Sequence, residues 1–87
     1  MSKTLDFMAY IEAQMDKNLP RVMYCYMGEQ DRLGQTYLAY KLDYMALNPF
    51  RFQQRKARQQ IEYFRRLIGA HLCEERVGYV ILTIPVR

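Results

Sequence analysis

The chain has 87 residues, of which 51% are hydrophobic, and it carries a formal net charge of +4. This length predicts one domain over residues 1–87 and leaves no room for a second core. Acidic residues interrupt the N-terminal segment where a secretion signal would lie, and the longest apolar run is about half of what spans a bilayer as a helix. We therefore expect a cytoplasmic protein without a membrane segment.

Residues 4–17 predict the first helix. Ser2 or Thr4 can cap it, and Pro20 ends it because a proline disfavours helical geometry in the preceding residue. The apolar positions recur at helical spacing and form one stripe, made of Phe7, Met8, Ile11 and Met15. We expect this stripe to face the core.

Residues 21–27 are short, aromatic and apolar on both faces, which indicates an interior β-strand. The polar residues 28–34 predict a loop with a glycine at each end. Residues 36–46 fit a strand, with Leu38, Tyr40, Leu42 and Tyr44 on one face, but Leu33, Tyr37, Tyr40 and Tyr44 would also share one face of a helix. We favour the strand because it would pair with 21–27 as a hairpin, whereas a helix would give a mostly helical fold.

The stretch from Asn48 to Leu72 predicts one long amphipathic helix over residues 49–72. Asn48 suits the N-cap, and Pro49 suits the first helical position. Gly69 could end the helix one turn earlier. At 100° per residue the expected buried face consists of Phe50, Ala57, Ile61, Phe64, Ile68 and Leu72.

The opposite side of this helix is basic. Between positions 51 and 66, six basic residues stand against Glu62 alone. The arginines of this face run about 22 Å along the axis at 1.5 Å per residue, and they are Arg51, Arg55, Arg58, Arg65 and Arg66. Arginines at i,i+4 repel unless something neutralises them, which favours an acidic partner. The alternative is that this charged face only meets water.

Residues 74–76 predict a polar joint, and residues 77–87 predict a strand that is apolar on both faces. The order α-β-β-α-β indicates an α+β domain in which two helices pack on one face of a three-stranded antiparallel sheet of order 2-1-3. The apolar last strand would then lie at an edge and could pair with a second copy, giving a homodimer through the C-terminal strand. Alternatively, Pro85 and Arg87 blunt that edge.

Few side chains suit catalysis or metal binding. Cys25, His71 and Cys73 match no common zinc spacing, and the two cysteines are expected to be reduced and semi-buried. A Cys25–His71 nucleophile pair lacks an orienting carboxylate, and no phosphate loop or hydrolase motif is present. We expect no catalytic residue, no metal and no cofactor, with a small enzyme using reactive Cys25, His71 or Cys73 as the alternative.

These patterns predict a non-enzymatic binding protein of the regulator, inhibitor or adaptor type, a class that includes small proteins of phages and mobile elements. It would dock an acidic protein surface through the basic helix face, with Tyr37 and Tyr63 at the margin. The eight tyrosines either line such a surface or complete the core, and Met8, Met15, Met23 and Met27 are expected in the core. The alternative partner is nucleic acid, with the same arginines on the phosphate backbone; the modest charge and the lack of a nucleic-acid motif favour protein.

Overall fold

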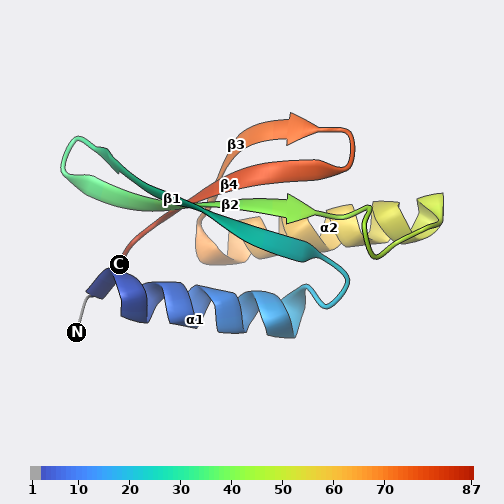
Figure 1. The fold of residues 1–87 in the computed structure, drawn as a ribbon, viewed down its shortest axis with the longest axis horizontal. Coiled ribbons are helices and arrows are strands. Elements are labelled where there is room, and N and C mark those ends of the chain that lie inside the picture. Colours follow the sequence, from blue (N-terminus) through green and yellow to red (C-terminus); the bar gives the residue numbers. More distant parts are fainter. Residues whose placement is uncertain (1–2) are drawn as a thin grey trace.

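Two helices lie on one face of a four-stranded antiparallel sheet (Figure 1). The computed structural model describes residues 3–87. The elements, in chain order, are α1 (Lys3–Asn18), β1 (Met23–Arg32), β2 (Gln35–Asp43), α2 (Arg51–Ile68), β3 (His71–Arg76) and β4 (Tyr79–Pro85). The predicted α+β class with two helices and an antiparallel sheet is confirmed. The prediction of three strands in the order 2-1-3 is wrong, because the sheet order is β1-β2-β4-β3.

The additional strand, β3, arises because α2 ends a turn earlier than its apolar spacing suggests. Gly69 takes a left-handed conformation with φ 69°, and the backbone N–H of Ala70 donates to the carbonyl of Arg65 at 2.9 Å. This Schellman-type ending releases residues 71–76 from the helix. Leu72, predicted on the buried helix face, and the predicted polar joint 74–76 therefore belong to β3.

The apolar strand β4 lies between β2 and β3 and pairs antiparallel with both. Its Val80, Leu82 and Ile84 are buried on the helix side, and Thr83 is only 4% exposed on the other side. The predicted edge position of this strand is therefore wrong. Because both backbone edges of β4 are already paired, a second copy cannot add to it, and the C-terminal strand is not available for the homodimer that the sequence left open.

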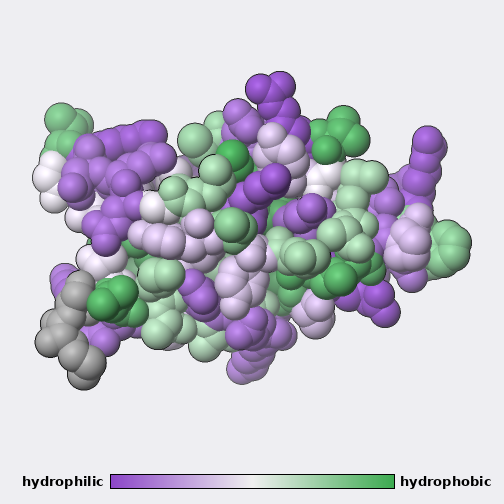
Figure 2. Space-filling view, in the orientation of Figure 1, coloured by the Kyte–Doolittle hydropathy of each residue, from purple (hydrophilic) through white to green (hydrophobic). Residues whose placement is uncertain are grey.

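Strand β1 is an edge strand, contrary to the predicted interior position of residues 21–27. Met23 and Met27, expected in the core, are each about half exposed. Figure 2 shows polar and apolar side chains mixed over this side of the molecule, with apolar ones gathered where β1 begins and β2 ends. Half of β1 thus packs inward while its alternate residues meet solvent.

The hairpin of β1 and β2 replaces the predicted loop over residues 28–34. Leu33 and Gly34 both have positive φ, 51° and 80°, and they join paired Arg32 and Gln35 in a two-residue turn of the type I′ kind. Residues 35–43 are a strand, as favoured, and not a helix. The predicted inward face is confirmed, since Leu38, Tyr40 and Leu42 are fully buried.

The core lies between the sheet and the two helices. Its largest fully buried side chain is Tyr40, whose hydroxyl donates to Oε2 of Glu12 on α1 at 2.7 Å. Burial, together with this hydrogen bond, raises the pKa of Tyr40. The helices contribute Ile11 and Met15 from α1 and Ala57, Ile61 and Phe64 from α2. At least this tyrosine therefore belongs to the core.

The prediction that Asn48 caps α2 is wrong, because the N-cap residue is Phe50; Asn48 instead positions the segment before the helix. The helix begins at Arg51, and Asn48 is fully buried. Its Nδ2 donates to the carbonyl of Arg21 at 2.8 Å and to the carbonyl of Tyr44 at 2.9 Å. Asn48 thereby ties the segment before β1 to the segment before α2.

We expect Asn48→Ala to lower the free energy of unfolding by about 2–3 kcal/mol, because two carbonyls would lose a buried donor. The matched control is Asn18→Ala, since Asn18 donates only within α1, to the carbonyl of Gln14; its cost should be below about 1 kcal/mol. Urea unfolding measures both. Equal costs would contradict the role assigned to Asn48.

Candidate functional site

The arginines of α2 lie on the flank of the helix that adjoins β3. The opposite, core-facing side is formed by Ala57, Ile61 and Phe64, all buried. Phe50, predicted on that face, instead lies exposed at the residue before the helix. The periodicity therefore places the predicted arginines on one flank, as the helical spacing requires.

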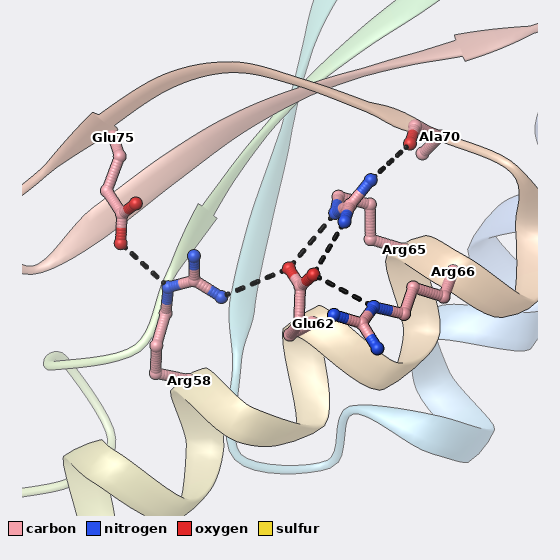
Figure 3. A network of polar contacts seen from close by, with 6 residues as sticks. All are labelled: Arg58, Glu62, Arg65, Arg66, Ala70 and Glu75. Atoms are coloured by element: carbon pink, nitrogen blue, oxygen red, sulfur yellow. Dashed lines mark hydrogen bonds and ion pairs between the residues drawn. The ribbon is translucent and has the colours of Figure 1, made fainter.

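Glu62 is the centre of an ion network on this flank (Figure 3). Arg65 approaches it with two nitrogens, Nη2 to Oε1 at 2.5 Å and Nε to Oε2 at 3.0 Å. Arg66 donates from Nε to Oε1 at 3.2 Å. The two-pronged contact of Arg65 is the geometry in which an arginine binds a carboxylate most strongly.

The network extends from α2 to β3 through two further contacts. Arg58 donates from Nε to Oε2 of Glu75 at 3.0 Å, and its Nη1 lies 3.8 Å from Glu62. Arg65 also donates from Nη1 to the carbonyl of Ala70 at 3.2 Å. These contacts hold the C-terminal half of α2 against the strand that follows it (Figure 3).

Three of the five predicted arginines thus have acidic partners within the chain. Glu62 is the one acidic residue among the arginines of the helix, whereas Glu75 comes from β3 and supplies a second carboxylate. Arg51 and Arg55 are exposed, and neither forms an ion pair with any residue in the described range 3–87. The charge left for a partner is therefore concentrated at the N-terminal half of α2.

The two tyrosines predicted at the margin lie elsewhere. Tyr37 is on the sheet face away from the helices, with its ring edge-on to His71 at a centroid distance of 6.1 Å. Tyr63 is on α2 and is 69% exposed, but it adjoins Asn18 of α1 and so lies on the other flank. The structure does not bring Tyr37 to the basic flank.

Two phenylalanines that the sequence argument missed stand beside the unpaired arginines. Phe50 and Phe52 are exposed, and their rings stack at a centroid distance of 6.0 Å with an interplanar angle of 8°. The exposure of Phe52 could have been predicted from the sequence, since at 100° per residue this side chain falls outside the apolar face of its helix. Exposed aromatics beside cations are typical of binding surfaces.

The two cysteines and His71 are the side chains that the alternative of a small enzyme would need. Cys25 and Cys73 are both exposed, so the expected semi-burial is wrong. Cys25 on β1 and His71 on β3 belong to opposite edges of the sheet, about 14 Å apart at the usual strand spacing. No cluster of three or more His, Cys, Asp or Glu side chains that could hold a metal occurs in residues 3–87.

Comparison with protein-family models, with curated proteins and with solved structures gave no match. Within residues 3–87, neither helix is long and apolar enough to cross a membrane.

The ion network makes the stability of the fold depend on pH through Glu62. The hydrogen bond from Arg65, followed by the positive charges of Arg65 and Arg66, lowers the pKa of the Glu62 carboxyl from its ordinary 4.5 to about 2. A carboxyl with a lowered pKa contributes stability that is complete above the ordinary pKa and is lost as the pH falls through the lowered value. The stability that ionised Glu62 contributes is therefore lost as the pH falls from 4.5 to about 2.

We expect Glu62→Gln to lower the free energy of unfolding at neutral pH by about 1 kcal/mol, the scale of a partly exposed ion-pair network. The difference in free energy of unfolding between this variant and the wild type should shrink as the pH falls from 4.5 toward 2. Urea unfolding across this range measures it, with Glu29→Gln as the control because Glu29 has no ion-pair partner among the described residues. A gap independent of pH would contradict this role.

Proposed function

We propose that the chain is a non-enzymatic binding protein, of the regulator, inhibitor or adaptor type, that docks on an acidic surface of a partner protein. The contact would be made by the docking face, which we define as Phe50, Arg51, Phe52 and Arg55. The observation that carries this proposal is the pair of exposed arginines without acidic partners in the described chain, beside two exposed stacked rings.

The chemistry of the docking face supports recognition of carboxylates. Arg51 and Arg55 are one turn apart, so their like charges repel until an anion lies between them. A guanidinium presents a planar fork that matches a carboxylate with two parallel hydrogen bonds. Phe50 and Phe52 add apolar area that water does not solvate well and that a protein partner would cover.

The ion network favours tight docking indirectly. Arg58 and Arg65 fasten the middle and the C-terminal end of α2 to β3 and to the carbonyl of Ala70. The helix is therefore held in place before a partner arrives, and less conformational entropy is lost on binding. In this proposal Arg58, Arg65 and Arg66 support the docking face and do not themselves meet the partner.

Nucleic acid is the second candidate partner, because a base could stack on Phe52 while Arg51 and Arg55 meet phosphates. A protein partner is favoured because the unpaired charge on the docking face comes from two residues, whereas nucleic-acid affinity rests on many phosphate contacts. The two candidates differ in salt dependence. On duplex DNA, log K falls by roughly 0.9 per phosphate contact for each tenfold rise in salt.

We expect Arg51→Glu/Arg55→Glu to abolish capture of an acidic partner protein from an extract of the native host. The control, Lys3→Glu/Arg32→Glu, makes the same change in net charge on exposed residues outside α2 and should capture the partner as the wild type does. Pull-down followed by mass spectrometry measures this. Fluorescence anisotropy with labelled duplex DNA and single-stranded RNA, across a salt series, is run in parallel.

Capture by both double variants alike would contradict the docking face. Micromolar or tighter binding to either nucleic acid that weakens with salt and is lost only in Arg51→Glu/Arg55→Glu would replace the protein partner with nucleic acid. Arg58→Glu is avoided as a probe because it would break the contact with Glu75 and lower stability.

A further inference from the structure

A groove runs between α1 and α2 and continues onto the segment that follows α1. It consists of three hollows of about 270, 290 and 440 Å³. The first two adjoin, since Lys56 and Gln60 line both. The third, and largest, lies at the other end of the same helix pair, lined by Tyr10 of α1 and Leu67 of α2. We call this feature the interhelical groove.

The interhelical groove is positively charged. Among the described residues that line the three hollows, the ionised side chains are those of Arg21, Lys56 and Arg87, and none is a carboxylate. Arg21 and Arg87 each donate a hydrogen bond to a backbone carbonyl, that of Leu47 at 3.5 Å and that of Ile68 at 3.1 Å, and none of the three cations forms an ion pair within residues 3–87. Two of the three positive charges therefore lie at the end that holds Arg21 and Lys56.

Large apolar side chains follow the α2 wall of the groove. Phe52, Tyr63 and Leu67 are 68%, 69% and 59% exposed. They lie about 16 Å and 6 Å apart along the axis at 1.5 Å per residue and share one side of the helix. Leaving three such side chains in water forgoes hydrophobic free energy that a covering partner would recover.

We infer that the interhelical groove takes an acidic segment of a partner protein that also carries large apolar side chains. Its carboxylates would meet Arg21 and Lys56, and its apolar side chains would enter the hollows beside Tyr63 and Leu67. This inference rests on the proposed function, because it takes the partner to be an acidic protein, and it adds a second contact beyond Arg51 and Arg55.

The chemistry of the third hollow distinguishes this occupant from single-stranded nucleic acid. Carbon atoms of Ile11, Leu67 and Ile68 line it, and these suit an aliphatic or aromatic side chain of a protein. A strand of nucleotides would bring a phosphate at every step, but Arg87 is the one cation among the described residues that line that end. The cations and the apolar lining of the interhelical groove thus match a protein segment that has both carboxylates and large apolar side chains.

The test uses a fluorescein-labelled synthetic peptide of Glu, Asp, Leu and Phe residues and the intact chain. A matched peptide replaces Leu and Phe with Ser, and a labelled oligothymidylate represents single-stranded nucleic acid. We expect Lys56→Glu and Tyr63→Ser/Leu67→Ser each to weaken binding of the first peptide at least tenfold by anisotropy, with the Ser peptide at least tenfold weaker on the wild type. The altered side chains are exposed, so the variants should fold, which circular dichroism checks.

Chemical-shift mapping on the wild type provides a readout that does not depend on any variant. Peptide-induced shifts at Arg21, Tyr63 and Leu67 are expected. Unchanged binding by Lys56→Glu, shifts confined to other surfaces, or tighter binding of the oligothymidylate than of the peptide would overturn the inference.

The Arg51→Glu/Arg55→Glu variant separates this inference from the proposed function. If that variant loses the peptide while Lys56→Glu keeps it, the docking face binds acidic protein and the interhelical groove does not. If Lys56→Glu loses the peptide and Arg51→Glu/Arg55→Glu keeps it, the groove is the contact and the docking face fails.

Discussion

The pairing of β4 on both of its edges is the constraint on which the rest of the fold depends. Its residues are the most apolar run in the chain, fully buried on the helix side and at least partly buried on the other, and a strand of this kind suits the interior of a sheet. Because β2 occupies one edge, the other edge needs a further strand, and residues 71–76 supply it. Placing β3 there brings Glu75 within reach of Arg58, so the ion network follows from the sheet order.

The ion network changes how the basic helix is interpreted. A helical wheel shows five arginines in a row, but in space two carboxylates satisfy three of them. The middle and the end of α2 then act as structural supports. The available cations of α2 are Arg51 and Arg55 on one flank and Lys56 on the other, so the charged part of each proposed contact lies toward the N-terminal half of the helix.

The sequence predicted the features that repeat with a regular period. The apolar stripe of α1, the inward face at Leu38, Tyr40 and Leu42, and the register of α2 all depend on alternation or on the helical spacing. Residues 71–76 have no such period, since an edge strand needs few buried side chains and β3 is mostly exposed. Its existence depends on the unpaired edge of β4, which no local pattern reveals.

The candidate site was predicted less completely, for the same reason. The arginine row was visible in the sequence, but the acidic partner from β3 and the position of Tyr37 on the far face depend on how distant segments meet. Asn48 shows the same limit, because its sequence context suits an N-cap while its amide binds carbonyls 27 and 4 residues away.

The two outer strands carry a protection against fibre growth. β3 presents Glu74, Glu75 and Arg76 along the free side of the sheet, and β1 is interrupted by a bulge at Met27 and Gly28. Charged side chains and bulges both hinder the addition of another strand to an open edge. These features oppose the growth of the sheet by edge pairing into amyloid-like ribbons.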